Sequence, residues 1–329
     1  MTTVLTKIQT EKAGQFIGHG GAIFTLEHAH DAHLFYSGSS DNLVVEWNLK
    51  EPEQNKVVAK LPAKALALKY VPDRNLLLVG QSLGGIHVID LNKREEIKLL
   101  QLHRQSIYDI QYLQEKECFW AVAGDGTLSV WSINDFSLIT ALKLCEKKVR
   151  SIDFNIILKE AAIGCGDGSI RIFDFETFEE KKILKGHVDD FSVNTVSYHP
   201  NGKYLLSGSR DAYLNIWDIE NDYALIHHIP AHNYAIYSIV FSPDKKFFAT
   251  GSRDKTIKIW DARLPARAGT DGNDGVGQAE NFELLLRIDK SKHEGHTHSV
   301  NKLLWSDFNN YLVSTGDDKA IMVWEIAKL

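Results

Sequence analysis

The feature that most constrains the fold is a motif that recurs along the whole chain at intervals of 42 to 44 residues, with a longer last interval of 64. Each copy has a turn of small residues, an acidic residue, an alternating segment and a closing aromatic residue. The copies read SGSSDNLVVEWN, VGQSLGGIHVID, AVAGDGTLSVWS, IGCGDGSIRIFD, SGSRDAYLNIWD, TGSRDKTIKIWD and STGDDKAIMVWE, of which the second is degenerate. Self-similarity at a fixed period indicates a repeat architecture in which each copy is one structural unit.

The spacing of the closing residues fixes seven repeats in register. These residues or their substitutes are Trp47, Ile89, Trp131, Phe173, Trp217, Trp260 and Trp324. Within each repeat, four short segments alternate between apolar and polar residues, and turn residues separate them. Alternation with a period of two predicts β-strands, and no segment carries a helical period long enough to compete. The sequence therefore predicts an all-β repeat protein.

The most regular repeats resemble a known family. GH…SGSRD…IWD in the fifth repeat and AH…TGSRD…IWD in the sixth are similar to WD repeats, and the resemblance covers essentially the whole chain. It implies a WD-repeat (WD40) seven-bladed β-propeller of four-stranded antiparallel blades. It also implies that a strand at the N-terminus, expected at Val4–Thr10 within residues 2–12, completes the last blade and closes the ring. Such closure removes an exposed strand edge.

The repeat boundaries divide one domain, residues 1–329, into blades. The expected blades cover residues 13–58, 59–100, 101–142, 143–184, 185–229, 230–290 and 291–329. The sixth contains an insertion over 264–281, rich in Gly, Asp, Ala and Asn, for which the sequence predicts a flexible loop. The resemblance places this loop between the third and fourth strands of its blade, on the bottom face, as either a docking loop or a tolerated tether.

Composition limits the cellular context and the partners. The formal net charge of -6 gives no support for wholesale binding to nucleic acid or to an anionic membrane. Three cysteines without a C-x-x-C pair argue against a disulfide framework. No secretory signal or bilayer-spanning apolar run is present. We therefore expect a soluble, monomeric protein of the cytoplasm, or of the nucleus in a eukaryote.

Ser, His and Asp residues recur at matched spacing in four repeats, which raises the question of a hydrolase triad. A catalytic triad is needed only once, so four equivalent sets argue for a structural role in each blade. The family resemblance implies tetrads in which Trp bonds Ser or Thr, the hydroxyl bonds His, and His bonds Asp. The four sets are His19, Ser37, Asp41, Trp47; His187, Ser207, Asp211, Trp217; His232, Thr250, Asp254, Trp260; and His296, Ser314, Asp318, Trp324.

The other three repeats depart from this pattern. The third has His103, Asp125 and Trp131 but Ala121 at the hydroxyl position. The fourth has Cys145 and Phe173 at the His and Trp positions. The second has Leu61, Leu83 and Ile89. We expect the second and fourth blades to be tied less rigidly, because each missing hydrogen bond is worth roughly 1 kcal/mol.

Two further features have alternative explanations. The segments EHAHDAH (Glu27–His33) and HEGHTH (His293–His298) could bind a metal ion, but we expect His28 to replace a core aromatic residue, and His296 belongs to a tetrad. Glu46 occupies a position that is β-branched and apolar in the other six repeats. It is either partly buried, with a raised pKa or a cationic partner, or a sign of an open first blade. No metal or cofactor is predicted.

The resemblance implies partner binding on the top face, around the central channel. One position near the channel mouth is Phe24, Leu66, Tyr108, Arg150, Asn194, Tyr237 and Asn301 in successive repeats. The residue before each turn acid forms a second ring: Ser40, Ser82, Gly124, Gly166, Arg210, Arg253 and Asp317. Arginine suits carboxylate or phosphate groups, and aromatic side chains are common interface anchors. These residues are equally compatible with ordinary solvated turns.

The sequence thus favours a non-catalytic scaffold whose top face binds partner proteins or acidic or phosphorylated peptides. One alternative is a small-molecule hydrolase or isomerase with a site at the channel mouth. It would need convergent His, Asp or Glu side chains, and the first ring has none. Another alternative is a subunit of a nucleic-acid-handling complex that is held by protein contacts, without direct nucleic-acid binding.

Overall fold

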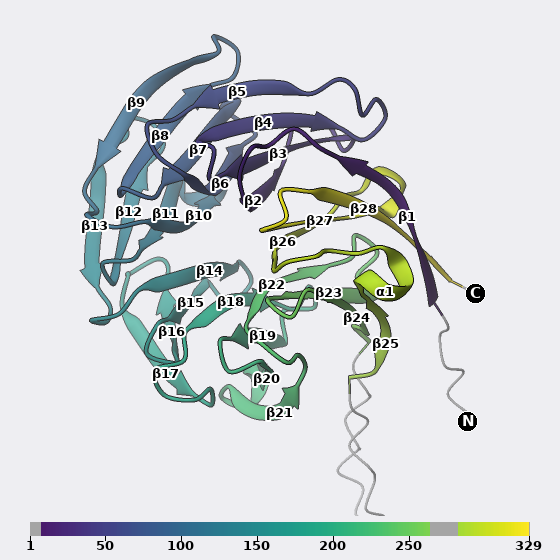
Figure 1. The fold of residues 1–329 in the computed structure, drawn as a ribbon. Helices are drawn as coiled ribbons and strands as arrows, with labels where there is room; N and C mark the ends of the chain where they lie inside the picture. The colour runs from purple at the N-terminus through teal and green to yellow at the C-terminus, as the bar shows by residue number, and fades with distance from the viewer. Residues whose placement is uncertain (1–7, 264–281, 329) are drawn as a thin grey trace, which may run out of the picture.

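The computed structural model describes residues 8–263 and 282–328, which form a closed ring of seven four-stranded antiparallel sheets (Figure 1). The predicted seven-bladed propeller is confirmed. In chain order the strands are β1 Ile8–Phe16; β2 Ile23–His28, β3 Leu34–Ser39, β4 Leu43–Asn48, β5 Lys56–Lys60; β6 Ala65–Val71, β7 Leu76–Gln81, β8 Gly85–Asp90, β9 Glu95–Gln101; β10 Ile107–Leu113, β11 Cys118–Ala123, β12 Thr127–Ser132, β13 Leu138–Lys143; β14 Val149–Asn155, β15 Glu160–Cys165, β16 Ser169–Asp174, β17 Glu180–Lys185; β18 Val193–Tyr198, β19 Tyr204–Ser209, β20 Tyr213–Asp218, β21 Ala224–Pro230; β22 Ile236–Phe241, β23 Phe247–Ser252, β24 Ile257–Asp261, β25 Leu284–Ile288; and β26 Val300–Trp305, β27 Leu312–Gly316, β28 Ile321–Lys328.

Helical structure in the described residues is confined to single turns. The helix α1 (Lys290–His293) begins after Asp289, whose side chain accepts a hydrogen bond from the backbone N–H of Lys292. Three short 3-10 turns, η1 (Gln114–Lys116), η2 (Ile219–Asn221) and η3 (Phe308–Asn310), lie between strands. No helix in the described ranges has the length and apolar character that crossing a membrane requires.

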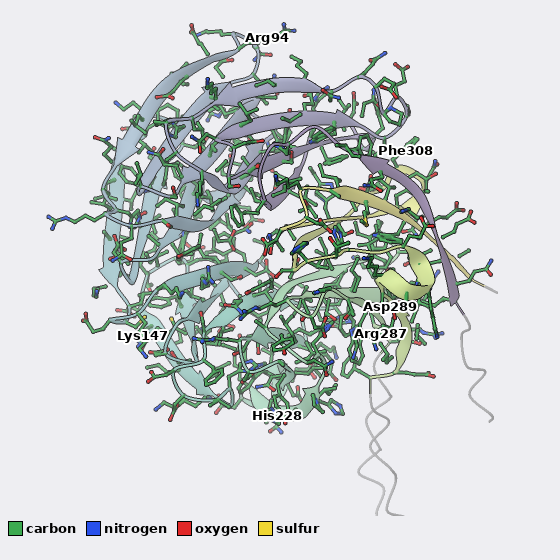
Figure 2. All side chains as sticks on the ribbon, in the orientation of Figure 1. Arg94, Lys147, His228, Arg287, Asp289 and Phe308 are labelled. Carbon is green, nitrogen blue, oxygen red and sulfur yellow. The ribbon has the colours of Figure 1, made fainter. Side chains whose placement is uncertain are left out.

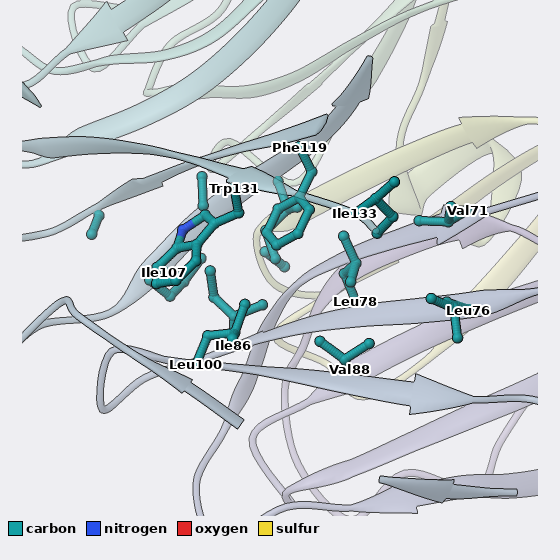
Figure 3. Packing of buried hydrophobic residues seen from close by; sticks show 14 residues of the cluster. Val71, Leu76, Leu78, Ile86, Val88, Leu100, Ile107, Phe119, Trp131 and Ile133 are labelled. Carbon is teal, nitrogen blue, oxygen red and sulfur yellow. The ribbon is translucent and has the colours of Figure 1, made fainter. Parts of the chain in front are cut away.

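The hydrophobic core lies between blades rather than at the centre of the ring. The second strand of a blade, such as β7, β11 or β15, is buried along its whole length because both of its faces pack against neighbouring blades. Leu78 and Val88 of blade two, for example, share one cluster with Phe119 and Trp131 of blade three (Figure 3). The outer strands are largely exposed, as in β9. Stacking of neighbours therefore supplies most of the burial, as in other repeat folds.

The ring is closed by β1, which pairs antiparallel with β28 in the sheet β1-β28-β27-β26. The predicted closing strand is confirmed. Within the described residues it runs over Ile8–Phe16, and both end residues are buried. It therefore contains Ile8–Thr10 of the expected Val4–Thr10 and extends further along the chain, while residues 4–7 lie outside the described residues. The strand reaches Phe16 because this ring packs against Phe35 and Trp47 of blade one, at the junction between the last and first blades.

The turn between the second and third strands of each blade has a common backbone geometry. The residue after the acid, or its equivalent, has a positive φ in every blade, and it is Gly84, Gly126 and Gly168 in blades two to four. Glycine takes this left-handed conformation without a steric cost. Backbone hydrogen bonds then join each turn to the loop that precedes the first strand of the same blade, as between Arg210 N–H and the Ser192 carbonyl. These turns and loops together form the top face.

The predicted insertion falls between β24 and β25, which pair with each other as the third and fourth strands of blade six. Residues 264–281 themselves lie outside the described residues. The three cysteines, Cys118, Cys145 and Cys165, are free thiols.

Candidate functional site

The Ser, His, Asp and Trp residues of blade one form a continuous hydrogen-bonded chain. The Trp47 indole N–H donates to Ser37 Oγ at 2.7 Å, and His19 Nε2 lies 2.7 Å from the same oxygen. His19 Nδ1 lies 2.8 Å from Asp41 Oδ2. Both Ser37 and Trp47 are buried, so no substrate can reach the hydroxyl. The chain joins the second and third strands to the top-face loop.

The same chain recurs in blades five, six and seven, with His–hydroxyl distances of 2.8 Å in each. Burial opposes ionisation of Asp211, but hydrogen bonds from His187 and from backbone N–H groups outweigh it and hold the pKa of this carboxyl below its usual value. The recurrence and the burial give these sets a structural role, because each set satisfies polar groups that would otherwise be costly inside the blade.

Blade three contains a fifth network that the sequence pattern did not predict. Ser129 on β12 supplies the hydroxyl, directly across the strand pair from Ala121 on β11. The Trp131 indole N–H donates to Ser129 Oγ at 2.8 Å, and His103 Nε2 lies 2.7 Å from it. In blade three the hydroxyl therefore comes from the third strand, whereas in the other four networks it comes from the second strand.

Blades two and four have no such network. Leu83 of blade two replaces the turn acid and is 67% exposed, while Leu61 and Ile89 are buried in the core. In blade four the thiol of Cys145 donates to the Lys147 carbonyl at 2.9 Å, and Phe173 is buried. These blades therefore lack the hydrogen bonds of the network, and their lower rigidity stays a prediction.

A layer of charged side chains lines the channel below its mouth. These side chains were not predicted from the sequence, where only the positions at the mouth were considered. Lys69 pairs with Glu27 at 3.3 Å. Asp109 accepts the backbone N–H of Ile152 at 2.9 Å, and Asp153 accepts that of Tyr198 at 2.7 Å. Each acceptor lies on the first strand of one blade, which is the inner strand next to the channel, and each donor lies on the inner strand of the next blade. The carboxylates therefore satisfy the open edges of the inner strands and join adjacent blades.

We expect Asp153→Asn to stabilise the protein at neutral pH. Burial, together with the neighbouring Asp109, raises the pKa of Asp153 to about 6, although hydrogen bonds from the backbone N–H groups of Tyr198 and Phe154, and the charge of Lys69, oppose this. The folded state then binds this proton more tightly than the unfolded chain, so the associated stability is present below about pH 4 and is lost as the pH rises through 6. Asparagine keeps the acceptor for Tyr198 without the charge. Thermal melts at pH 7.5 should rise by about 2–4 °C and those at pH 4.5 should not change; an equal shift at both pH values would contradict this assignment.

A pocket of about 580 Å³ opens on the top face over blades three to six. We call it the basic pocket. Its charged lining consists of Lys147, Lys148, Arg150, Arg210 and Arg253, with Glu146 and Asp190. The structure brings six of the eight predicted partner-binding residues to its wall: Tyr108, Arg150, Asn194, Arg210, Tyr237 and Arg253.

The other two predicted residues, Phe24 and Asn301, lie in the adjoining channel mouth, a second pocket of about 460 Å³. Both predicted asparagines take part in structural contacts. Asn194 Nδ2 donates to the Ile236 carbonyl, and Asn301 Nδ2 donates to the Ile23 carbonyl, each at 3.0 Å. They join inner strands of adjacent blades, so the arginines and aromatic residues remain the candidates for contact with a partner.

Each arginine of the basic pocket lies over an aromatic ring. Arg150 is 4.3 Å from the ring centre of Tyr108, Arg210 is 5.4 Å from Phe191, and Arg253 is 5.9 Å from Tyr234. Such stacking orients a guanidinium while leaving its N–H edge free to bind an anion. Phe191 and Tyr234 were missed by the sequence reasoning. Both precede the inner strand by two residues, at a loop position that also holds Gly21, so the repeat pattern carried no signal for them.

Only part of the charge in the pocket is neutralised. Lys147 pairs with Asp190 at 2.6 Å (Figure 2 labels Lys147). The pKa of Lys148 is lowered, first by the nearby Arg150 and then by burial and Arg210. Burial also lowers the pKa of Arg150. These shifts show that cations crowd this part of the surface, which favours binding of an anion.

The structure explains the environment of Glu46 and of the histidine-rich segments by ordinary contacts. Glu46 is half-buried and accepts a hydrogen bond from Tyr36, whose pKa is raised by burial and by this carboxylate. Of the alternatives considered for Glu46, partial burial is the one observed, and its partner is this hydroxyl and not a cation. The prediction that His28 occupies a core position was wrong, because it lies at an exposed strand end. Within residues 8–263 and 282–328, no three His, Cys, Asp or Glu side chains converge as metal ligands would.

Comparison with known proteins agrees with this architecture. The family model "WD domain, G-beta repeat" matches residues 10–48, 178–218, 223–261 and 289–325. Four of the seven blades are therefore WD repeats. The four matched repeats are those in which the sequence carries the complete Trp, Ser or Thr, His and Asp set, and the family model does not match blades two to four, which depart from that pattern.

Curated WD-repeat relatives are distant. The chain is 24% identical to "Eukaryotic translation initiation factor 3 subunit I" of Emericella nidulans, over 64% of this chain and 54% of that protein. It is 21% identical to the protein of the same name from Nematostella vectensis, over 67% of this chain and 87% of that protein. It is 25% identical to "Pre-mRNA-processing factor 17" of Homo sapiens, over 62% and 36% respectively. The WD-repeat chain thus spans about half of the first relative and about a third of the last.

Proposed function

We propose that this protein is a non-catalytic scaffold that binds partner proteins through the basic pocket on its top face. The observation that carries the proposal is the group of three arginines, each over an aromatic ring, in one pocket of a protein whose net charge is -6. A positive pocket on an acidic protein selects negatively charged segments, and aromatic and arginine side chains supply most binding energy at interfaces. An acidic or phosphorylated peptide is the ligand class that fits.

The rest of the molecule supports a binding role rather than catalysis. The Ser, His and Asp residues are buried in structural networks, and the carboxylates of the channel accept backbone N–H groups. A hydrolase or isomerase would instead need such groups in an accessible pocket, free to contact a substrate. We place the protein in the cytoplasm, or in the nucleus of a eukaryote, acting as a monomer and without a cofactor.

Reversing two charges of the pocket should abolish partner capture. We expect Arg150→Glu/Arg253→Glu to reduce recovery of specific partners by tenfold or more, since charge reversal replaces attraction by repulsion across an interface. The measurement is affinity purification from the native host followed by quantitative mass spectrometry. Arg94→Glu is the matched control, because Arg94 lies at the exposed tip of the turn between β8 and β9, far from Lys147 (Figure 2). Equal recovery of the same partners by the double variant and wild type would refute the proposal.

A second candidate, membership of a nucleic-acid-handling complex through protein contacts, is favoured by the names of the relatives, which refer to translation initiation and pre-mRNA processing. Under this proposal, partners captured from the host include RNA-binding proteins and remain bound after nuclease treatment, because the contact is between proteins. Partners that are released by nuclease would argue against it.

A further inference from the structure

We propose that the basic pocket binds a phosphomonoester dianion, presented as a phosphorylated side chain of the partner, between blades four and five. This inference rests on the proposed function of the top face and narrows its ligand from acidic peptides in general to phosphorylated ones. The residues that carry it are Lys148 and Arg150 of blade four and Arg210 of blade five.

The first argument is the surplus of positive charge. The pocket contains five cationic side chains and two carboxylates, Glu146 and Asp190, and these two pair with Lys143 and Lys147. Within the described part of the chain, Lys148, Arg150 and Arg210 form no ion pair with a carboxylate. A single carboxylate would neutralise one of the three. A phosphate group carries roughly -1.5 to -2 charges at neutral pH, so it matches the surplus more closely.

The second argument is the arrangement of donors. Arg150 is held over Tyr108 and is half-buried, and its Nε has no hydrogen-bond partner among the described residues. The hydroxyl of Ser192, also at the wall of the pocket and 4% exposed as a residue, is likewise without a partner there. Buried polar groups are normally satisfied, so two such groups beside one pocket indicate a ligand with several acceptor oxygens. A phosphate offers three, whereas a carboxylate offers two in one plane.

The third argument separates a protein-borne phosphate from a free one. The rim of the pocket has exposed aromatic rings, Phe191 at 39% and Tyr234 at 60%. Exposed rings beside a polar pocket provide contact area for the residues that flank a phosphorylated side chain, which inorganic phosphate lacks. The ligand is therefore expected to include peptide on both sides of the phosphate.

Fluorescence anisotropy with three degenerate peptide libraries tests the inference. The libraries are identical except for a central phosphoserine, glutamate or serine. We expect the phosphoserine library to bind about tenfold more tightly than the glutamate library, because its second charge and third oxygen engage a further cation. Lys148→Gln should remove most of this difference, and Arg94→Gln, an exposed cation outside the pocket, should leave it intact. Thermal melts verify that each variant is folded.

Four outcomes would overturn the inference. Equal affinity for the phosphoserine and glutamate libraries, with both lost in Arg150→Glu/Arg253→Glu, would reject the phosphate while leaving the proposed function in place. Competition by inorganic phosphate at the concentrations at which the phosphopeptide competes would reject a peptide ligand. Tighter binding of a labelled single-stranded RNA would assign the pocket to nucleic acid. Failure of both acidic libraries, with unchanged partner capture by the charge-reversed variant, would reject the proposed function as well.

Discussion

Removing residues 1–16 lowers the melting temperature of this propeller by about 10 °C or more, or prevents folding altogether. The truncation deletes the outer strand of the last blade, which pairs with β28 from Ile8 to Phe16. It removes the buried side chains of Ile8 and Phe16, whose burial is worth roughly 1.5–3 kcal/mol each, and leaves the β28 edge unpaired. Loss of closure also removes the strand pairing between the last blade and the N-terminal part of the chain, so that blade seven is held to blade one only by contacts such as that of Asn301 with the Ile23 carbonyl.

Two point variants make this test specific to burial rather than to chain length. Phe16→Ala should cost about 3–5 kcal/mol, because the ring is packed against Phe35 and Trp47. Gln15→Ala, at the exposed preceding position of the same strand, should cost less than about 0.5 kcal/mol. Unfolding in urea measures both. A truncated protein that melts with wild type, or a Phe16→Ala variant as stable as Gln15→Ala, would contradict the role of β1.

Ser129→Ala should destabilise the protein by about 2–4 kcal/mol, which is the second large effect we expect. The hydroxyl is fully buried and bonds both Trp131 and His103. Its removal leaves two buried polar groups without partners, each at a cost of roughly 1–3 kcal/mol. Urea unfolding followed by tryptophan fluorescence measures the change.

A rescue variant distinguishes the hydrogen bonds from a loss of packing. Ala121 lies directly across the strand pair from Ser129, at the position that holds the hydroxyl in four other blades. Ala121→Ser combined with Ser129→Ala should therefore restore most of the lost stability. If Ser129→Ala alone costs less than about 0.5 kcal/mol, the fifth network has no energetic significance.

The sequence predicted the architecture well because the period of the repeat determines it. Each copy must bury its faces against its neighbours, so seven registered copies imply seven blades, and the spacing from His19 to Trp47 is compatible with one arrangement of the network. The same reasoning located Arg150, Arg210 and Arg253 on one face, since equivalent positions of successive blades lie on the same side of a ring.

The features that escaped prediction are those in which contacts cross strands or loops out of register. Ser129 replaces a hydroxyl of the neighbouring strand, which a position-by-position comparison of repeats does not reveal. Phe191 and Tyr234 lie in loops without a repeat signal, and only the folded chain brings them under arginines. The end of β1 depends on the packing of Phe16 against the first blade, which is a contact between the last and first blades of the ring.

The most direct test of a scaffold that binds through its top face is hydrogen–deuterium exchange of the protein alone and in the complex captured from its host. We predict slower amide exchange in the loops and turns around the basic pocket, which include residues 145–149, 189–192, 209–212 and 252–255. Exchange at the turns between the first and second strands of each blade, which lie on the opposite face, should not change; residues 156–159 between β14 and β15 are one such turn. Protection confined to that opposite face or to the outer strands, with the pocket exchanging as in the free protein, would contradict the account.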